Sequence, residues 1–346
     1  MYDFRKTHTF LVIFGLILGV LLALLIGLMV GSVKISATDI ANRIIDKISG
    51  TALDDSISRI IFLSRLPRLI SAASSGCALA LAGLSTQTLF KNPLATPSVI
   101  GISNGAALGA IIAQLVSNKL SLGFFELVPL CSILSGLTTT AIIFVLSRKS
   151  IFFGYSLLLA GIAISSICSS IMTALLYISG ERLQSIMFWL MGGLWLTNWT
   201  SASILMLLAF LVLIILLFLS PSMNVALIGE GPAHNLGLNV KKFQQLLLAI
   251  IAITTSLVVS VTGVIGFIGL VVPHLARLII GTDNRFLVPA SALGGAFLLI
   301  VADTLARTLA SPAEIPVGIF TAIIGAPIFL WILQKKLAKH THESNR

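Results

Sequence analysis

The sequence predicts an all-α polytopic membrane protein with about ten transmembrane helices in a single domain (1–346), and two observations lead to this prediction. Hydrophobic residues make up 57% of the chain and charged residues only 10%, whereas soluble domains have roughly 25% charged residues. Long apolar runs also follow one another, each near the ~20 residues that a helix needs to cross a bilayer. This composition excludes a cytosolic enzyme, a disordered protein and a nucleic-acid binder, although the net charge is +10.

The apolar runs give the predicted spans in chain order. The first run follows Arg5 and Lys6, but it is too long for a signal peptide and lacks a small-residue cleavage site, so we expect a retained helix. Small residues at 71–76 and 165–170 allow close helix packing and predict a compact bundle. A short apolar piece, 186–196, cannot cross and is interpreted as a half-helix at one face. The spans are predicted at 10–31, 66–90, 94–117, 124–147, 155–178, 201–219, 243–262, 264–281, 286–306 and 315–333.

The basic residues predict the orientation of these spans. An even number of spans places both termini on one side, and that side then holds 13 of the 22 Lys and Arg residues. Three doublets (Arg148-Lys149, Lys241-Lys242 and Lys335-Lys336) also fall there. Because cytoplasmic loops are enriched in Lys and Arg, we expect both termini to be cytoplasmic.

A faint internal echo predicts a duplication of about 64–178 and 243–333. Gly83 and Pro93 recur as Gly263 and Pro273, an offset of 180 residues. Transporters are often built from two related halves. In a glycine-rich chain such matches also arise by chance, so both interpretations stay open at this point.

Sequence signatures of bond chemistry are missing. The sequence has no GxxxxGK[ST] loop for nucleotide phosphates, no GxSxG element and no metal-ligand spacing among its His, Cys and acidic residues. We therefore expect no catalytic residue, no metal and no cofactor bound by this chain. Asp303, with Arg307 one helical turn later, is the main ionisable residue inside a span, and we interpret it as a local pair near a membrane face. Since proton-coupled carriers need more buried carboxylates, we expect the energy source to lie outside the chain.

Several unusual stretches identify a family resemblance. In their order and spacing they resemble the FecCD-type permeases, the membrane-subunit family of type II ABC importers for iron chelates, haem and cobalamin. The resemblance covers about residues 60–333. The stretches are RLPR at 65–68, NPLATP at 92–97, LLLAGIA at 157–163, GFIGLVVPHLAR at 266–277, EIPVG at 314–318 and GAP at 325–327.

The resemblance implies a function and a set of partners. Such a permease is a homodimer in the cell inner membrane, with its pathway along the dimer axis. Two ATPase subunits carry ATP and Mg on the cytoplasmic side, and a periplasmic substrate-binding protein docks on the other face. Import would then follow ATP-driven alternating access. An iron-siderophore is the expected substrate, with haem, cobalamin and a molybdate-type oxyanion as alternatives. An ion-coupled secondary transporter remains the alternative function, and an intramembrane enzyme is the third.

The resemblance also implies roles for two groups of residues. Arg65, Arg68 and Arg307 would meet acidic residues of the binding protein, while the alternative is that they snorkel to the interface. In the loop after the sixth span, Pro232 can open a short helix and Gly237 can close it. By resemblance this helix couples to the ATPase, and the alternative is a plain connecting loop. The predicted coupling residues are Glu230, Pro232, Ala233, His234, Leu236 and Gly237.

Two further groups are placed near the pathway. By resemblance, Gly154, Tyr155 and Ser156 narrow it at the cytoplasmic end, and the alternative is an ordinary capped helix start. Two prolines four residues apart prevent a continuous helix at 92–97, and Asn92 can satisfy the freed backbone groups. The predicted helix breaks near the pathway are Asn92, Pro93, Pro97, Gly266, Gly269 and Pro273.

Overall fold

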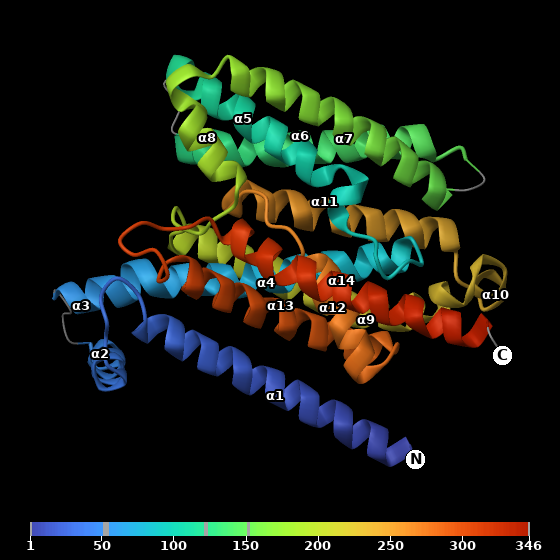
Figure 1. Cartoon of the computed structure of the whole chain (residues 1–346), viewed down its shortest axis with the longest axis horizontal. Helices are drawn as coiled ribbons and strands as arrows, with labels where there is room; N and C mark the ends of the chain where they lie inside the picture. The colour runs from blue at the N-terminus through green and yellow to red at the C-terminus, as the bar shows by residue number, and fades with distance from the viewer. Residues whose placement is uncertain (1, 51–54, 121–123, 151–152, 345–346) are drawn as a thin grey trace.

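The computed structural model describes residues 2–50, 55–120, 124–150 and 153–344, and these residues form helices joined by turns and loops (Figure 1). The α-helices are α1 (Tyr2–Met29), α2 (Ala37–Ile48), α3 (Ser56–Arg59), α4 (Leu66–Leu89), α5 (Ile102–Leu120), α6 (Phe124–Ser147), α7 (Phe153–Tyr177), α8 (Leu183–Leu190), α9 (Trp199–Ile228), α10 (Glu230–Asn235), α11 (Val240–Thr262), α12 (Ile268–Ile280), α13 (Asn284–Ala306) and α14 (Val317–Ser344). A π-helix, η1 (Ile60–Arg65), and two 3-10 helices, η2 (Pro97–Ile100) and η3 (Gly180–Arg182), complete the order.

The helices confirm the predicted all-α polytopic fold. Seven helices are long and apolar enough to cross a membrane. Three shorter apolar helices, at 102–117, 268–280 and 317–331, fall within the remaining predicted spans. The half-helix predicted at 186–196 corresponds to α8 and the turn that follows it. The predicted duplication stays a prediction.

The second, third and eighth spans begin at other residues than predicted. The second span begins at Ser56 rather than at residue 66, because α3, η1 and α4 form one helical run. The π-helical turn directly before Pro67 accommodates the missing proline N–H within that run. The third span begins at Ile102 rather than at residue 94, because the chain is non-helical or 3-10 helical from Lys91 to Gly101. The eighth begins at Ile268, after Phe267 in the left-handed region with φ 66°.

The sixth span is longer than predicted. The expected run was 201–219, but α9 continues through Pro221 to Ile228. Its first residue, Trp199, donates its indole N–H to the carbonyl of Phe62 in η1 at 2.7 Å. Its other end is separated from α10 by Gly229 alone.

α4 lies at the centre of the bundle. Most of its residues are buried, and it packs against α9, α11, α12 and α13. Glycine pairs allow two of these helices to approach closely. A Cβ added to Gly83 would lie 1.9 Å from the carbonyl oxygen of Gly269 on α12, and one added to Gly76 would lie 2.1 Å from that of Gly295 on α13. Small residues at contact points are what lets helices associate in lipid.

Three of the remaining spans form a group of their own beside this centre. α5, α6 and α7 pack on one another, and α11 lies between them and α4 (Figure 1). Both chain termini and α10 lie at one end of the bundle, which we call the α10 end, whereas α2 and α3 lie at the opposite end, which we call the α2 end (Figure 1). The common location of the termini agrees with an even number of crossings.

We expect Gly83→Ala to destabilise the protein by about 1–3 kcal/mol, because the added methyl group meets backbone that cannot rotate away. The measurement is the thermal unfolding of the purified chain in detergent. Gly15→Ala is the control, since nothing lies within 4 Å of a Cβ built on Gly15. Equal unfolding temperatures for the two variants would show that the contact between α4 and α12 is looser than described.

Candidate functional site

Three buried arginines gather at the α2 end. Arg65, Arg68 and Arg307 are only 4%, 8% and 7% exposed. Arg65 donates hydrogen bonds to the carbonyls of Leu28 and Val33, and Arg307 donates to that of Gly27. Gly27 and Leu28 belong to the last turn of α1, whose carbonyls have no partner within the helix. Two guanidinium groups therefore cap the negative end of the α1 dipole.

Arg68 instead holds two carboxylates. Its Nε and Nη2 donate to Asp303 on α13 at 2.9–3.1 Å, and its Nη1 donates to both oxygens of Glu314 at 2.9 Å. Glu314 lies in the loop between α13 and α14, and this loop is also closed by the N–H of Ile315 donating to the carbonyl of Ala306 at 3.1 Å. We call Arg65, Arg68, Arg307, Asp303 and Glu314 the Arg68 cluster.

The cluster adds to one expectation from the sequence and corrects another. The docking role expected for Arg65 and Arg68 stays a prediction, and the structure adds that both side chains are buried, with partners inside the protein. Asp303 does not form its ion pair with Arg307 one turn away; its ion-pair partner is Arg68, 235 residues away in the chain. Burial without these partners would leave charges unpaired in an apolar environment, which costs several kcal/mol per ion.

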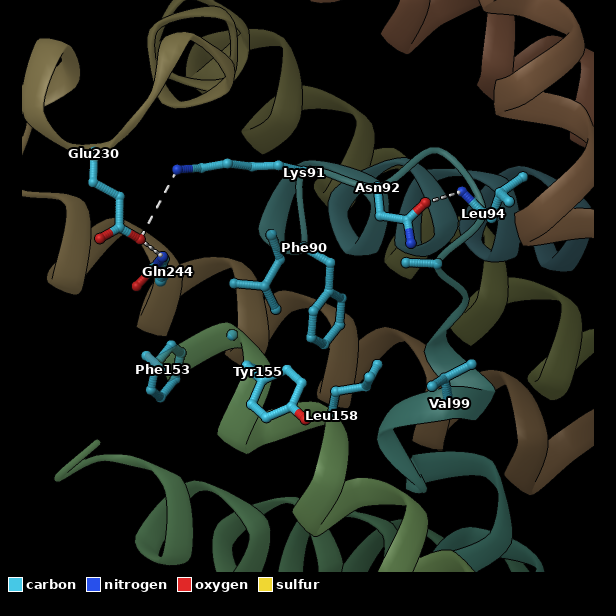
Figure 2. A pocket seen from close by; sticks show the side chains of 13 residues that line it. Phe90, Lys91, Asn92, Leu94, Val99, Phe153, Tyr155, Leu158, Glu230 and Gln244 are labelled. Carbon is cyan, nitrogen blue, oxygen red and sulfur yellow. Dashed lines mark hydrogen bonds and ion pairs between the residues drawn. The ribbon is translucent and has the colours of Figure 1, made fainter. Parts of the chain in front are cut away.

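A cavity of about 520 Å³ opens at the α10 end. We call it the Tyr155 cavity, because Gly154 and Tyr155 at the start of α7 form one of its walls. Phe90, Asn92 and Leu94 from the segment after α4 form another wall, and Glu230 of α10 and Gln244 of α11 close it (Figure 2). The structure thus brings predicted gate, helix-break and coupling residues to one cavity.

Polar contacts connect the walls of the Tyr155 cavity. Glu230 accepts a hydrogen bond from Gln244 at 3.3 Å and lies 3.9 Å from the ammonium group of Lys91 (Figure 2). Lys91 has φ 50°, in the left-handed region. It ends α4 in a Schellman motif, with its N–H donating to Thr88 and that of Asn92 to Gln87. Glycine is usual at such a position, and lysine here places a cation at the negative end of α4.

The three predicted gate residues have different environments. Gly154 and Tyr155 face the cavity, and the Tyr155 side chain is 66% exposed in the single chain. Ser156 is not among the residues that line the cavity. Its hydroxyl group donates to that of Ser150 at 2.6 Å.

α10 is a short, exposed helix with a well-defined end. It begins at Glu230 rather than at Pro232, two residues earlier than the sequence suggested. It ends as predicted near Gly237, which has φ 85° and completes a second Schellman motif through Gly237 N–H to His234 and Leu238 N–H to Ala233. Ala233 is buried against the bundle, while Pro232, His234 and Leu236 are exposed.

Three of the residues predicted to break helices near the pathway lie around one cavity. Pro97, Gly266 and Gly269 line a second cavity of about 250 Å³. The Asn92 side chain accepts from the N–H of Leu94 at 3.0 Å, which supports the turn at Pro93. Pro273, however, does not break a helix, because α12 runs through it. The carbonyl of Gly269, which Pro273 leaves without its helical donor, faces the Gln87 amide at 3.4 Å instead.

α1 and α7 are the least buried spans, with only 17% of the residues in each apolar stretch buried. The exposed face of α1 carries large apolar side chains such as Phe10 and Phe14. α7 also exposes large apolar side chains such as Ile162 and Ile167, but hydroxyl groups lie among them, at Ser166, Ser170 and Thr173 between Tyr155 and Tyr177. Each of these hydroxyl groups donates to a carbonyl one turn earlier in the helix. These tyrosines are about six helical turns apart and so lie near the same face, at opposite ends of α7.

Sequence reasoning assigned no role to Lys91, Gln244, Glu314 or Tyr177. Glu314 was visible only as part of the EIPVG motif, and an exposed acid in a loop gives no sign of an arginine partner. Lys91 and Glu230 are separated by more than a hundred residues, so spacing could not pair them. Of these residues, only Tyr177 could have been placed from the sequence, because helical periodicity puts it near the same face of α7 as Tyr155.

Comparisons with known proteins place this geometry in context. The model of the FecCD transport family matches residues 17–335. The chain is 43% identical to the hemin transport system permease protein of Yersinia pestis over 290 residues (83% of this chain, 86% of the relative). It is 42% identical to the vitamin B12 import system permease protein of Salmonella arizonae over 272 residues (78% and 82%). A solved metal-chelate type ABC transporter in an inward-facing conformation matches with TM-score 0.81 and 33% identity, covering 93% of this chain and 98% of that one.

We expect Asp303→Asn to cost about 3–5 kcal/mol of unfolding free energy, because it removes the buried charge that pairs with Arg68. The measurement is chemical or thermal unfolding in detergent. Asp55→Asn is the matched control: Asp55 pairs with Arg43 at 3.2 Å, but both side chains are about one-third exposed, so a loss of about 0–1 kcal/mol is expected. Similar losses in the two variants would contradict a structural role for the buried pair.

Proposed function

Since this chain belongs to the FecCD transport family, we propose that it is the permease subunit of a type II ABC importer for a metal chelate. Two copies would enclose the pathway, and separate ATPase subunits would supply the energy. The observation that carries this proposal is the Tyr155 cavity, because residues of α10 and of the α7 start form its walls together. A displacement of α10 by the ATPase would therefore change the wall that it shares with the start of α7, at the proposed inner gate of the pathway.

α10 is the proposed contact for the ATPase. Its exposed side chains, together with Ile228 and Leu236, which are 63% and 66% exposed, offer a small apolar surface on a rigid, capped turn. Apolar residues in such a position favour burial by a partner protein. Because α10 shares its end of the bundle with both termini (Figure 1), the ATPase side and both termini would be cytoplasmic in the inner membrane, with ATP and Mg held by the partner.

The exposed face of α7 is the proposed wall of the pathway. Its hydroxyl groups suit water and a passing solute, whereas the apolar face of α1 suits lipid. Two such faces opposed across a homodimer axis would form a conduit with a tyrosine near each end. The face lacks charged residues from Tyr155 to Tyr177, which fits transit of a large chelate without tight binding.

The α2 end is the proposed docking face for a substrate-binding protein. The Arg68 cluster holds three guanidinium groups against two carboxylates, so its net charge favours an acidic partner surface. Arg68, Arg65 and Arg307 would all contribute to this field, although Arg65 and Arg307 also cap α1. Relatives are named for hemin and for vitamin B12, and we propose a metal chelate of that kind, with an iron-siderophore as the first substrate to test.

An ion-coupled carrier is less well supported. Asp303 is fully buried and accepts three hydrogen bonds from Arg68, so it has a fixed structural partner and does not face a pathway. The decisive experiment reconstitutes the chain in liposomes alone and together with its ATPase and binding protein. Uptake of a metal chelate should require all components and ATP, and vanadate should block it. Uphill accumulation by the chain alone would refute the proposal.

We expect Leu236→Asp to abolish co-purification of the ATPase, because it places a charge in the proposed apolar contact. The chain itself should stay folded, since this side chain is exposed. Leu309→Asp is the matched control: Leu309 is 65% exposed but lies in the loop after α13, at the α2 end. ATPase lost equally from both variants would argue against α10 as the contact.

We also expect Ser170→Cys to react with a membrane-impermeant, water-soluble thiol reagent in the assembled importer, because the α7 face would line an aqueous pathway. Phe14→Cys on α1 should not react, since lipid would cover it. Both rates are read above the background of the parent chain with its cysteines at 77, 131 and 168. The same low rate at both positions would place lipid, or a tight protein contact, on the α7 face.

A further inference from the structure

The guanidinium group of Arg68 has two edges, and each edge binds a different carboxylate. Nε and Nη2 face Asp303, while Nη1 faces Glu314. A planar guanidinium can hold two acids in this way because its donors form a fixed fork. Both contacts have similar lengths, so distance alone does not distinguish them.

The two carboxylates differ in burial. The side chain of Asp303 is 0% exposed and that of Glu314 is 36% exposed. Asp303 lies in α13, and replacing it would leave a buried charge. Glu314 lies in the loop that leads to α14, and its partly exposed carboxylate can be solvated by water when it leaves the arginine. One edge of Arg68 is thus fixed by a buried partner, and the other can exchange its partner at a smaller cost.

We propose that Glu314 is a built-in, exchangeable occupant of Arg68, and that a carboxylate of the docking protein takes its place. The inference rests on the proposed docking function of the α2 end. In the undocked state Glu314 satisfies Nη1 and keeps the arginine oriented. On docking, an acidic side chain of the partner accepts from Nη1, Glu314 turns to solvent, and Asp303 holds Arg68 in position throughout.

The exchange has a structural consequence for the loop. The side chain of Glu314 ties the segment between α13 and α14 to α4 through Arg68, and the hydrogen bond from Ile315 to Ala306 remains as the second tie. Release of Glu314 would therefore loosen the start of α14 when the partner arrives. An acidic protein surface, rather than a free anion, fits this exchange, because the carboxylate must arrive with a surface that covers the loop.

The test uses the binding protein that supports uptake in the reconstituted importer. It measures the affinity of this protein for the importer in nanodiscs at low salt. Glu314→Gln should bind about two- to five-fold more tightly, because the competing charge is gone. Glu181→Gln is the matched control, since Glu181 is exposed in η3 after α7, at the same end of the bundle, and forms no ion pair with Arg68. An unfolding temperature equal to that of the parent chain shows that Glu314→Gln is intact.

Arg68→Lys separates failure of the exchange from failure of the docking proposal. Lysine keeps the charge near Asp303 but cannot hold two carboxylates in a fork, so binding should weaken about ten-fold and the gain from Glu314→Gln should vanish in the double variant. If Arg68→Lys weakens binding but Glu314→Gln does not tighten it, or Glu181→Gln tightens it equally, the exchange is wrong and docking stands. If Arg68→Lys binds like the parent, the docking proposal itself is wrong.

Discussion

Backbone groups that a helix end or a proline leaves free need partners within an apolar bundle, and this constraint places the polar residues described above. No water reaches the hydrocarbon layer to replace a missing hydrogen bond. The ends and interruptions of the helices therefore carry the polar residues: Arg65 and Arg307 cap α1, Gln87 lies beside the carbonyl that Pro273 leaves free, and Asn92 supports the turn before η2. Two residues of this set, Arg65 and Arg307, also belong to the proposed docking face.

The same constraint separates what the sequence could predict from what it could not. The order of the apolar helices followed from the apolar runs, although only seven of the described helices are long and apolar enough to cross a membrane. The short helix at α10 followed from its proline and glycine. The start of the second span was misplaced at residue 66, although the helical run begins at Ser56. Arg65 lies inside this run, where carbonyls of Leu28 and Val33 accept from its guanidinium group, and a single sequence does not show such distant partners.

In both proposed sites, single residues could be predicted from the sequence, but pairs of residues could not. The motif order was sufficient to point to Arg68, Tyr155 and α10. It did not show that Glu314 occupies Arg68 or that Lys91 lies beside Glu230, since those pairs depend on which helices meet in three dimensions. Local rules gave the C-terminal end of α10 near Gly237 but placed its start two residues late, and tertiary packing decided the rest.

The length of α9 has a consequence for signalling between the two faces of the membrane. Its 30 residues form one rod of about 45 Å, with Trp199 bonded to η1 beside the Arg68 cluster and Ile228 one residue from α10. The rod ends at Gly229, whose φ of 135° lies in a region that favours glycine. A side chain at this position would strain the single-residue step between the long helix and the short one, so the spacing between the Arg68 cluster and α10 depends on that glycine.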